Sequence, residues 1–142
     1  LAQGEIGDLF YYIIVYSHER GWLPADLART IGAENEGWVS IQSAVKRQTG
    51  NEDIFTLAMQ LSAASGKISS FTLNHISSGS SGDKTSAESM LRLEEVSARL
   101  SLAGALYAAI EIANRFGLNA EEIAAFNASK LKARHPNGWK VL

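Results

Sequence analysis

The sequence predicts an all-α protein, a bundle of helices joined by short connections. Three observations favour this class: apolar residues recur at helical spacing, the two prolines lie near expected element boundaries, and glycines follow the periodic segments. Long stretches without proline permit long helices, because proline removes a backbone donor and clashes with the preceding turn. With 142 residues, 46% of them hydrophobic, the chain can form a domain with a buried core.

The composition limits the kinds of partner and binding site that the protein can have. The net charge is -2, so nothing suggests a nucleic-acid or membrane-surface partner. The absence of cysteine excludes a disulfide framework and a zinc–thiolate site, and it fits a reducing, cytoplasmic location. The apolar run from Leu9 to Tyr16 is too short to span a bilayer and lacks the features of a signal peptide. Because the sequence begins at Leu1 rather than Met, we expect a piece of a longer protein.

The first part of the chain predicts two helices. Residues 5–20 carry side chains at spacings of three and four, as on one buried helix face: Ile6, Leu9, Phe10, Ile13, Ile14 and Ser17. The stretch is rich in aromatic and β-branched residues, so a strand is the competing interpretation. Its length and Gly21 favour the helix. Pro24 then lies in the first turn of a short helix that ends near Gly32.

Further helices are expected over residues 38–48, 53–74, 86–116 and 120–133. The Gly/Ser-rich run 77–82 reads as a loop, and Asn119 is a good N-cap because Glu122 follows at capping-box spacing. Apolar residues are predicted to face the core in the first three of these helices. They are Val39, Ile41 and Val45 in the first; Ile54, Leu57, Ala58, Leu61, Ile68, Phe71 and Leu73 in the second; and Leu91, Leu93, Val96, Leu100, Leu102, Leu106, Ile110 and Ile112 in the third.

An internal repeat is also predicted. Residues 5–28 superpose on residues 101–124 at a constant offset of 96, and each copy reads as a helix, a glycine stop and a short helix. The matched positions include Tyr11 with Tyr107, Gly21 with Gly117, Leu27 with Ile123, and Ala28 with Ala124. The shared layout indicates a duplication.

The end of the chain carries polar, proline, glycine and aromatic residues at a fixed spacing. They read Asn127-x-x-Lys130-Leu131-x-x-Arg134-His135-Pro136-x-Gly138-Trp139. This pattern resembles the closing motif of the MazG-like, all-α nucleoside triphosphate pyrophosphohydrolases. The resemblance covers residues 37–139 and implies a MazG-like helical bundle. In that interpretation residues 37–142 form a second copy, and residues 1–33 are the closing helices of a first copy.

The resemblance implies a Mg²⁺-dependent hydrolysis of a nucleoside triphosphate to the monophosphate and pyrophosphate. In the family, one helix supplies Glu-x-x-Glu and the next long helix Glu-x-x-Asp. This spacing places both carboxylates on one helix face, and four such oxygen donors suit a hard cation. Glu5 and Asp8 match the second pair and are the predicted metal ligands. The alternative is an acidic helix start that complements the helix dipole.

The second copy departs from the family at its ligand positions, where it carries Ala64, Lys67, Ser101 and Gly104. We therefore predict that it does not hold the metal as the family does, since Lys67 places a cation where Mg²⁺ belongs. The Glu-x-x-Glu partner of Glu5 and Asp8 would come from sequence before Leu1 or from another chain.

The substrate-binding prediction concerns the last helix. Asn127, Lys130 and Arg134 lie on one helix face at spacings of three and four. Such a cluster binds phosphate, but cations at a helix C-terminus also complement the helix dipole without any ligand. Both interpretations stay open. The predicted partners are thus a nucleoside triphosphate and, to complete the bundle, a second copy or missing upstream sequence.

Other polar and aromatic residues are given structural roles. Glu94 and Glu95 are expected to face solvent. The tryptophans, Trp22, Trp38 and Trp139, are expected as core or interface anchors. The histidines, His18, His75 and His135, are scattered and have no zinc-binding spacing. The functional alternative to the pyrophosphohydrolase is a catalytically inactive helical binding or dimerisation module.

Overall fold

The computed structural model describes residues 2–48, 50, 52–78 and 84–134, with the backbone alone at residues 2, 3, 74–78 and 84–91. Throughout these residues the regular structure is helical, which confirms the predicted class. The helices are α1 (Ala2–Glu19), α2 (Pro24–Ile31), α3 (Trp38–Gln48), α4 (Ile54–Ser78), α5 (Lys84–Arg115) and α6 (Ala120–Arg134). The ends differ by a few residues from the predicted ones, and the expected loop 77–82 lies partly in α4 and partly outside the described residues.

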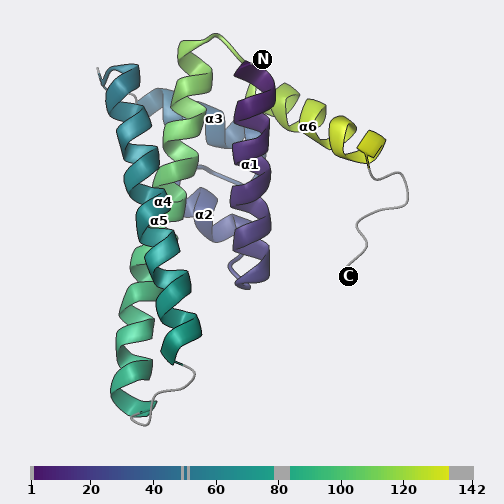
Figure 1. Cartoon of the computed structure of the whole chain (residues 1–142). Helices are drawn as coiled ribbons and strands as arrows, with labels where there is room; N and C mark the ends of the chain where they lie inside the picture. Colours follow the sequence, from purple (N-terminus) through teal and green to yellow (C-terminus); the bar gives the residue numbers. More distant parts are fainter. Residues whose placement is uncertain (1, 49, 51, 79–83, 135–142) are drawn as a thin grey trace.

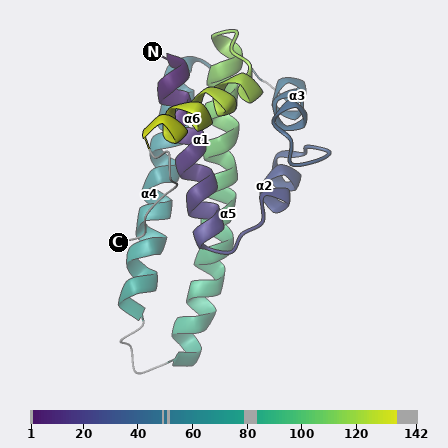
Figure 2. The same ribbon diagram turned by 90° about the vertical axis from the view of Figure 1, so that its right-hand side faces the viewer.

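The two longest helices form an antiparallel hairpin, and the other helices gather around one half of it (Figure 1). α1 runs alongside α5, while α2 and α3 pack on another side of α5. α6 crosses the N-terminal part of α1, as the rotated view makes clear (Figure 2). The far half of the α4–α5 hairpin projects beyond the remaining helices in both views.

α5 occupies the centre of the molecule because small side chains let its neighbours approach closely. Its buried residues alternate alanines with larger apolar groups: Ala98, Leu102, Ala103, Ala105, Leu106, Ala108, Ala109, Ile110 and Ala113. Helices α1, α2, α3 and α4 all contact it. One segment of α5, Arg92–Arg115, is long and apolar enough to span a bilayer by composition alone, but 56% of its most apolar window is buried inside the protein. A core helix passes the same test.

The glycines that follow the helices act as predicted. Gly21, Gly32 and Gly117 adopt left-handed backbone angles, with φ of 73°, 92° and 68°. Each ends its helix in a Schellman motif, in which its own N–H and the next residue's N–H donate to carbonyls three and five positions earlier. The α1–α2 and α5–α6 turns therefore share one geometry, at positions 96 residues apart.

The N-terminus of α6 is held by two side chains. Asn119 Oδ1 accepts from the backbone N–H of Glu122 at 3.0 Å, so the predicted N-cap is confirmed. Gln42 of α3 accepts from the N–H of Ala120 at 2.9 Å and donates to the carbonyl of Leu118, also at 2.9 Å. This amide ties α3 to the α5–α6 turn.

Several predicted core positions are exposed. In α5, Leu93, Val96 and Leu100 are 75%, 55% and 57% exposed, because they lie on a face of the helix that its neighbours do not cover. The predictions for Val39, Ile54, Ala58, Leu73 and, in α1, Leu9 are wrong for the same kind of reason, since no described helix covers their faces. Helical spacing identifies an apolar face but not the partner that buries it.

The contact between Trp22 and Glu95 corrects a second expectation. Trp22 is buried, as expected of a core anchor, and its Nε1 donates to Glu95 Oε1 at 2.9 Å. Glu95 is therefore not a simple solvent-facing charge, since it satisfies the indole N–H of a buried tryptophan. Trp38 stacks on Phe10 of α1 with a ring separation of 4.6 Å. Trp139 lies outside the described residues.

Candidate functional site

The fold joins a predicted metal ligand to two predicted substrate-binding residues. Asp8 Oδ1 accepts hydrogen bonds from Asn127 Nδ2 at 3.0 Å and from Lys130 Nζ at 2.8 Å. Asn127 is 5% exposed, whereas Asp8 and Lys130 are partly accessible. These residues come from helices at opposite ends of the chain, so the crossing of α1 and α6 creates the cluster.

Gly7 makes the crossing possible. A Cβ added to Gly7 would lie 3.2 Å from Asn127 Cβ and 3.4 Å from Ile123 Cγ2, which is tighter than ordinary contact. The glycine thus lets the backbone of α1 approach α6 closely enough for Asp8 to reach Asn127. Ile6 and Ile123 are buried beside this contact and anchor it in the core.

The cations of α6 keep Asp8 ionised. The hydrogen bond from Lys130 is the main cause of a lowered pKa at Asp8, and the Lys130 charge, Asn127 and the charge of Arg134 lower it further. Partial desolvation opposes the shift. Arg134 is exposed at the end of α6, and no hydrogen bond joins it to Asp8 within the described residues. Glu5 is exposed one turn before Asp8 on α1.

The cluster offers two of the oxygen ligands that a divalent cation needs. Glu5 and Asp8 are carboxylates at i, i+3 spacing, but among the described residues no three His, Asp or Glu side chains lie together as a metal-binding group. One Asp8 oxygen is also engaged by the ammonium of Lys130. The described residues therefore do not form a complete Mg²⁺ site, which would require further carboxylates.

The four residues that stand at the predicted ligand positions of the second copy lie close together. Ala64 and Lys67 of α4 and Ser101 and Gly104 of α5 line a single pocket of about 410 Å³. The antiparallel packing of the two helices brings the pairs face to face, although they lie far apart in sequence. We call this space the α4–α5 pocket.

The α4–α5 pocket contains residues that the sequence reading missed. Tyr107 and Glu111 of α5, Gln60 of α4 and Glu52 before α4 also line it. Glu111 is 1% exposed and forms an ion pair with Arg115 at 3.3 Å. Burial and the charges of Glu111 and Glu52 raise the pKa of Tyr107. The sequence feature that could have pointed to this site is Glu111, a lone carboxylate within the apolar run 102–113.

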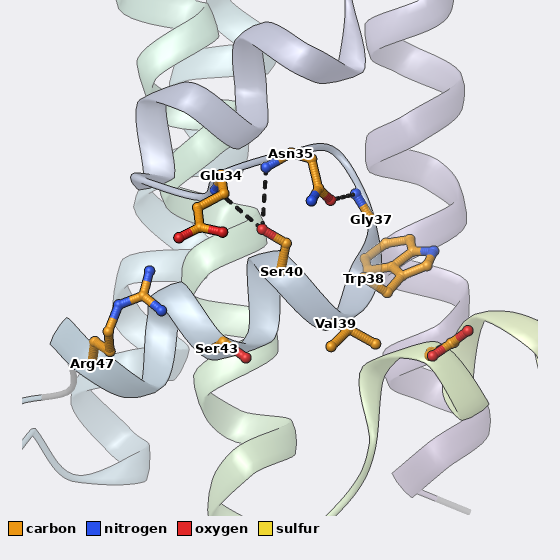
Figure 3. A pocket seen from close by; sticks show the side chains of 9 residues that line it. Glu34, Asn35, Gly37, Trp38, Val39, Ser40, Ser43 and Arg47 are labelled. Atoms are coloured by element: carbon orange, nitrogen blue, oxygen red, sulfur yellow. Dashed lines mark hydrogen bonds between the residues drawn. The ribbon is translucent and has the colours of Figure 1, made fainter.

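A second depression lies at the start of α3 (Figure 3) and was not predicted. Glu34, Trp38, Ser40 and Arg47 are among the residues that line its volume of about 560 Å³. Ser40 Oγ accepts from the backbone N–H groups of Glu34 and Asn35, and Asn35 Oδ1 accepts from that of Gly37. These donors are used within the loop, so the depression gives no specific indication of a ligand.

The structure does not describe the last part of the closing motif. His135, Pro136, Gly138 and Trp139 of the closing motif lie outside the described residues. Compared with protein-family models, with curated proteins and with solved structures, the chain gives no match. The MazG-like resemblance and the division into residues 1–33 and 37–142 therefore stay predictions.

Proposed function

We propose that this chain is part of a tandem MazG-like nucleoside triphosphate pyrophosphohydrolase, whose single metal site begins with Glu5 and Asp8. The observation that carries the proposal is the meeting of Asp8 with Asn127 and Lys130 across the α1–α6 crossing. The sequence alone predicts Asp8 as a metal ligand and Asn127 and Lys130 as substrate-binding residues, without knowledge of their contact. A polyphosphate near Asp8 would find the Asn127 amide and the cations of Lys130 and Arg134 beside it.

The packing of the helices supports the duplicated organisation. At the offset of 96 residues, α1 corresponds to α5 and α2 corresponds to α6. α6 packs on α1, and α2 packs on α5, so each short helix contacts the long helix of the other copy. The matching Schellman turns at Gly21 and Gly117 add local geometry to this exchange. Such reciprocal packing is what a two-copy bundle requires.

The proposed site also needs a further helix. Between α1 and α4 lies an open, mainly apolar groove of about 320 Å³. Leu9, Tyr12 and Tyr16 of α1 and Leu61 and Ile68 of α4 are among its lining residues. A helix that completes the metal site would have to bring a Glu-x-x-Glu pair to the face of α1 that carries Glu5 and Asp8, and the groove is an apolar surface beside α1 on which such a helix could pack. Sequence before Leu1 or another chain would supply the helix, as the sequence analysis expects.

In the complete site, Mg²⁺ would neutralise the triphosphate and activate a water. This chain's residues would hold the substrate: Asn127 donates a hydrogen bond, and Lys130 and Arg134 place positive charge beside the phosphates. Lys130 would exchange its present contact with Asp8 for the phosphate. The described residues do not complete the metal site, so we assign them binding and orientation only.

The competing candidate is a catalytically inactive helical binding or dimerisation module. One observation favours it: Lys130 already neutralises Asp8, and an ion pair of this kind stabilises a helix crossing without any ligand. The exposed apolar residues of α5 and the α1–α4 groove would then be the binding surface.

The deciding experiment measures pyrophosphate release from a panel of deoxynucleoside triphosphates with Mg²⁺. With the completing helix present, in a protein that includes sequence before Leu1 or in an assembled oligomer, we expect turnover by the wild type and its loss in Glu5→Gln and Asp8→Asn. Circular dichroism checks that each variant folds. Glu19→Gln is the matched control, because Glu19 is an exposed carboxylate on the same helix, away from α6. Equal turnover in wild type and Glu5→Gln removes Glu5 from the site. No turnover by any folded variant favours the binding module.

A further inference from the structure

The α4–α5 pocket exists because facing positions carry small side chains. Ala63 and Ala64 of α4 lie opposite Ser101 and Gly104 of α5, and a Cβ added to Gly104 would meet nothing within 4 Å. Two helices that pack over such residues leave space that larger side chains would fill. The resulting volume of about 410 Å³ lies within the range of small-molecule sites.

Opposite charges mark the two ends of this pocket. α4 and α5 are antiparallel, so Lys67 lies toward the Ser101 end, and Glu111 lies about 15 Å farther along α5 at 1.5 Å per residue. Glu52 lies toward the Glu111 end, because it stands just before α4, whose N-terminal end packs beside the C-terminal part of α5. The pocket therefore has an ammonium at one end and carboxylates at the other.

The charges that line the pocket are not all neutralised within the protein. Glu111 has Arg115 as its partner, whereas Lys67 and Glu52 form no ion pair among the described residues. A bound molecule with an anion at one end and hydrogen-bond donors at the other would satisfy both. Divalent cations fit the Lys67 end of this pocket poorly, because Lys67 repels them and Ala64, Ser101 and Gly104 offer no carboxylate there.

We propose that the α4–α5 pocket binds a nucleoside monophosphate bearing an exocyclic amino group, without a divalent cation. The phosphate would accept hydrogen bonds from Lys67 and Ser101, the base would lie near the Tyr107 ring, and its amino group would donate to Glu52. The choice of a nucleotide rests on the proposed function, while the charge pattern stands independently of it. The second copy would then be a binding site that replaced metal by lysine.

The test is calorimetric titration of the whole chain with AMP in EDTA. AMP is expected to bind, and Lys67→Met to weaken binding about tenfold or more, since a charged hydrogen bond is lost. Lys46→Met is the matched control, an exposed lysine of α3 outside the pocket, and should bind as the wild type does. UMP lacks the exocyclic amine and should bind more weakly than AMP, with a smaller difference in Glu52→Gln.

The outcomes separate this proposal from the proposed function. Binding that requires Mg²⁺ and disappears in Glu5→Gln, but not in Lys67→Met, would place the nucleotide at the α1–α6 cluster and overturn the pocket proposal. No binding of AMP or CMP to the folded chain would also overturn it. AMP binding in EDTA that is unchanged in Glu5→Gln would support the pocket, whereas the hydrolase is refuted separately, by no pyrophosphate release with Mg²⁺ from a protein that includes the completing helix.

Discussion

Lys130 of α6 donates a hydrogen bond from Nζ to Oδ1 of Asp8 in α1, at a distance of 2.8 Å. This ion pair joins two helices through residues that are 122 positions apart in the sequence. Asn127 donates to the same oxygen. The ion pair holds Asp8 in its charged form, so the proposed ligand is preorganised as a carboxylate. Because of this ion pair, the stability of the α1–α6 contact should depend on pH and on salt.

The first prediction concerns acid pH. The pKa of Asp8 in the folded protein is lower than the ordinary aspartate value of 3.8, mainly because of the hydrogen bond from Lys130. Its contribution to stability is therefore fully present above about pH 4 and is lost as pH falls through the lowered folded value. Urea unfolding between about pH 6 and pH 3 should show Asp8→Asn less stable than the wild type, with the difference shrinking toward the acid end. A difference that stays constant over this range would contradict the assignment.

The second prediction concerns the strength of the Asp8–Lys130 pair. Both side chains are partly exposed, so a double-mutant cycle with Asp8→Asn and Lys130→Met should give a coupling of about 0.2–1 kcal/mol in the free energy of unfolding. The coupling should fall when salt is raised from about 0.1 M to 1 M, because salt screens partly exposed charges. Zero coupling at low salt would mean that the pair does not stabilise the crossing.

The third prediction compares two helical glycines. Alanine in place of an exposed helix glycine gains about 0.5–1 kcal/mol, and Gly66→Ala should do so because nothing lies within 4 Å of its added Cβ. Gly7→Ala gains the same propensity but presses on Asn127 at 3.2 Å. We expect Gly7→Ala to be less stable than Gly66→Ala by about 1 kcal/mol. Equal stabilisation of both in chemical denaturation would show that α1 and α6 are not in close contact.

The fourth prediction concerns the brace between α3 and the α5–α6 turn. Gln42 makes hydrogen bonds to Asn114, Leu118 and Ala120. Gln42→Met keeps the shape but removes all three, which should cost about 2–3 kcal/mol at roughly 1 kcal/mol for each bond. Gln60→Met is the control, since Gln60 is an exposed amide of α4, and its change should stay within about 0.5 kcal/mol. Similar unfolding midpoints for the two variants would show that the hydrogen bonds of Gln42 do not stabilise the fold.

Local chemistry made the helices predictable. Gly21 and Gly117 end their helices because only glycine adopts the left-handed angles without strain, and Asn119 begins α6 because its side chain satisfies a free N–H. These effects act within a single turn of backbone. The segment Trp38–Gln48 was accordingly predicted with its observed bounds. Fold class and helix order therefore follow from the sequence.

Contacts between distant segments were decided by the tertiary structure alone. Leu93 was expected in the core and is exposed, because no periodicity says which faces of α5 its neighbours cover. Asp8 could be chosen as a ligand from a motif, but its contact with Lys130 depends on how α1 crosses α6, which Gly7 controls through close packing. Glu111 entered the α4–α5 pocket only through the antiparallel register of two helices. Side-chain spacing fixes a helix face, whereas the angle and depth of packing fix what that face meets.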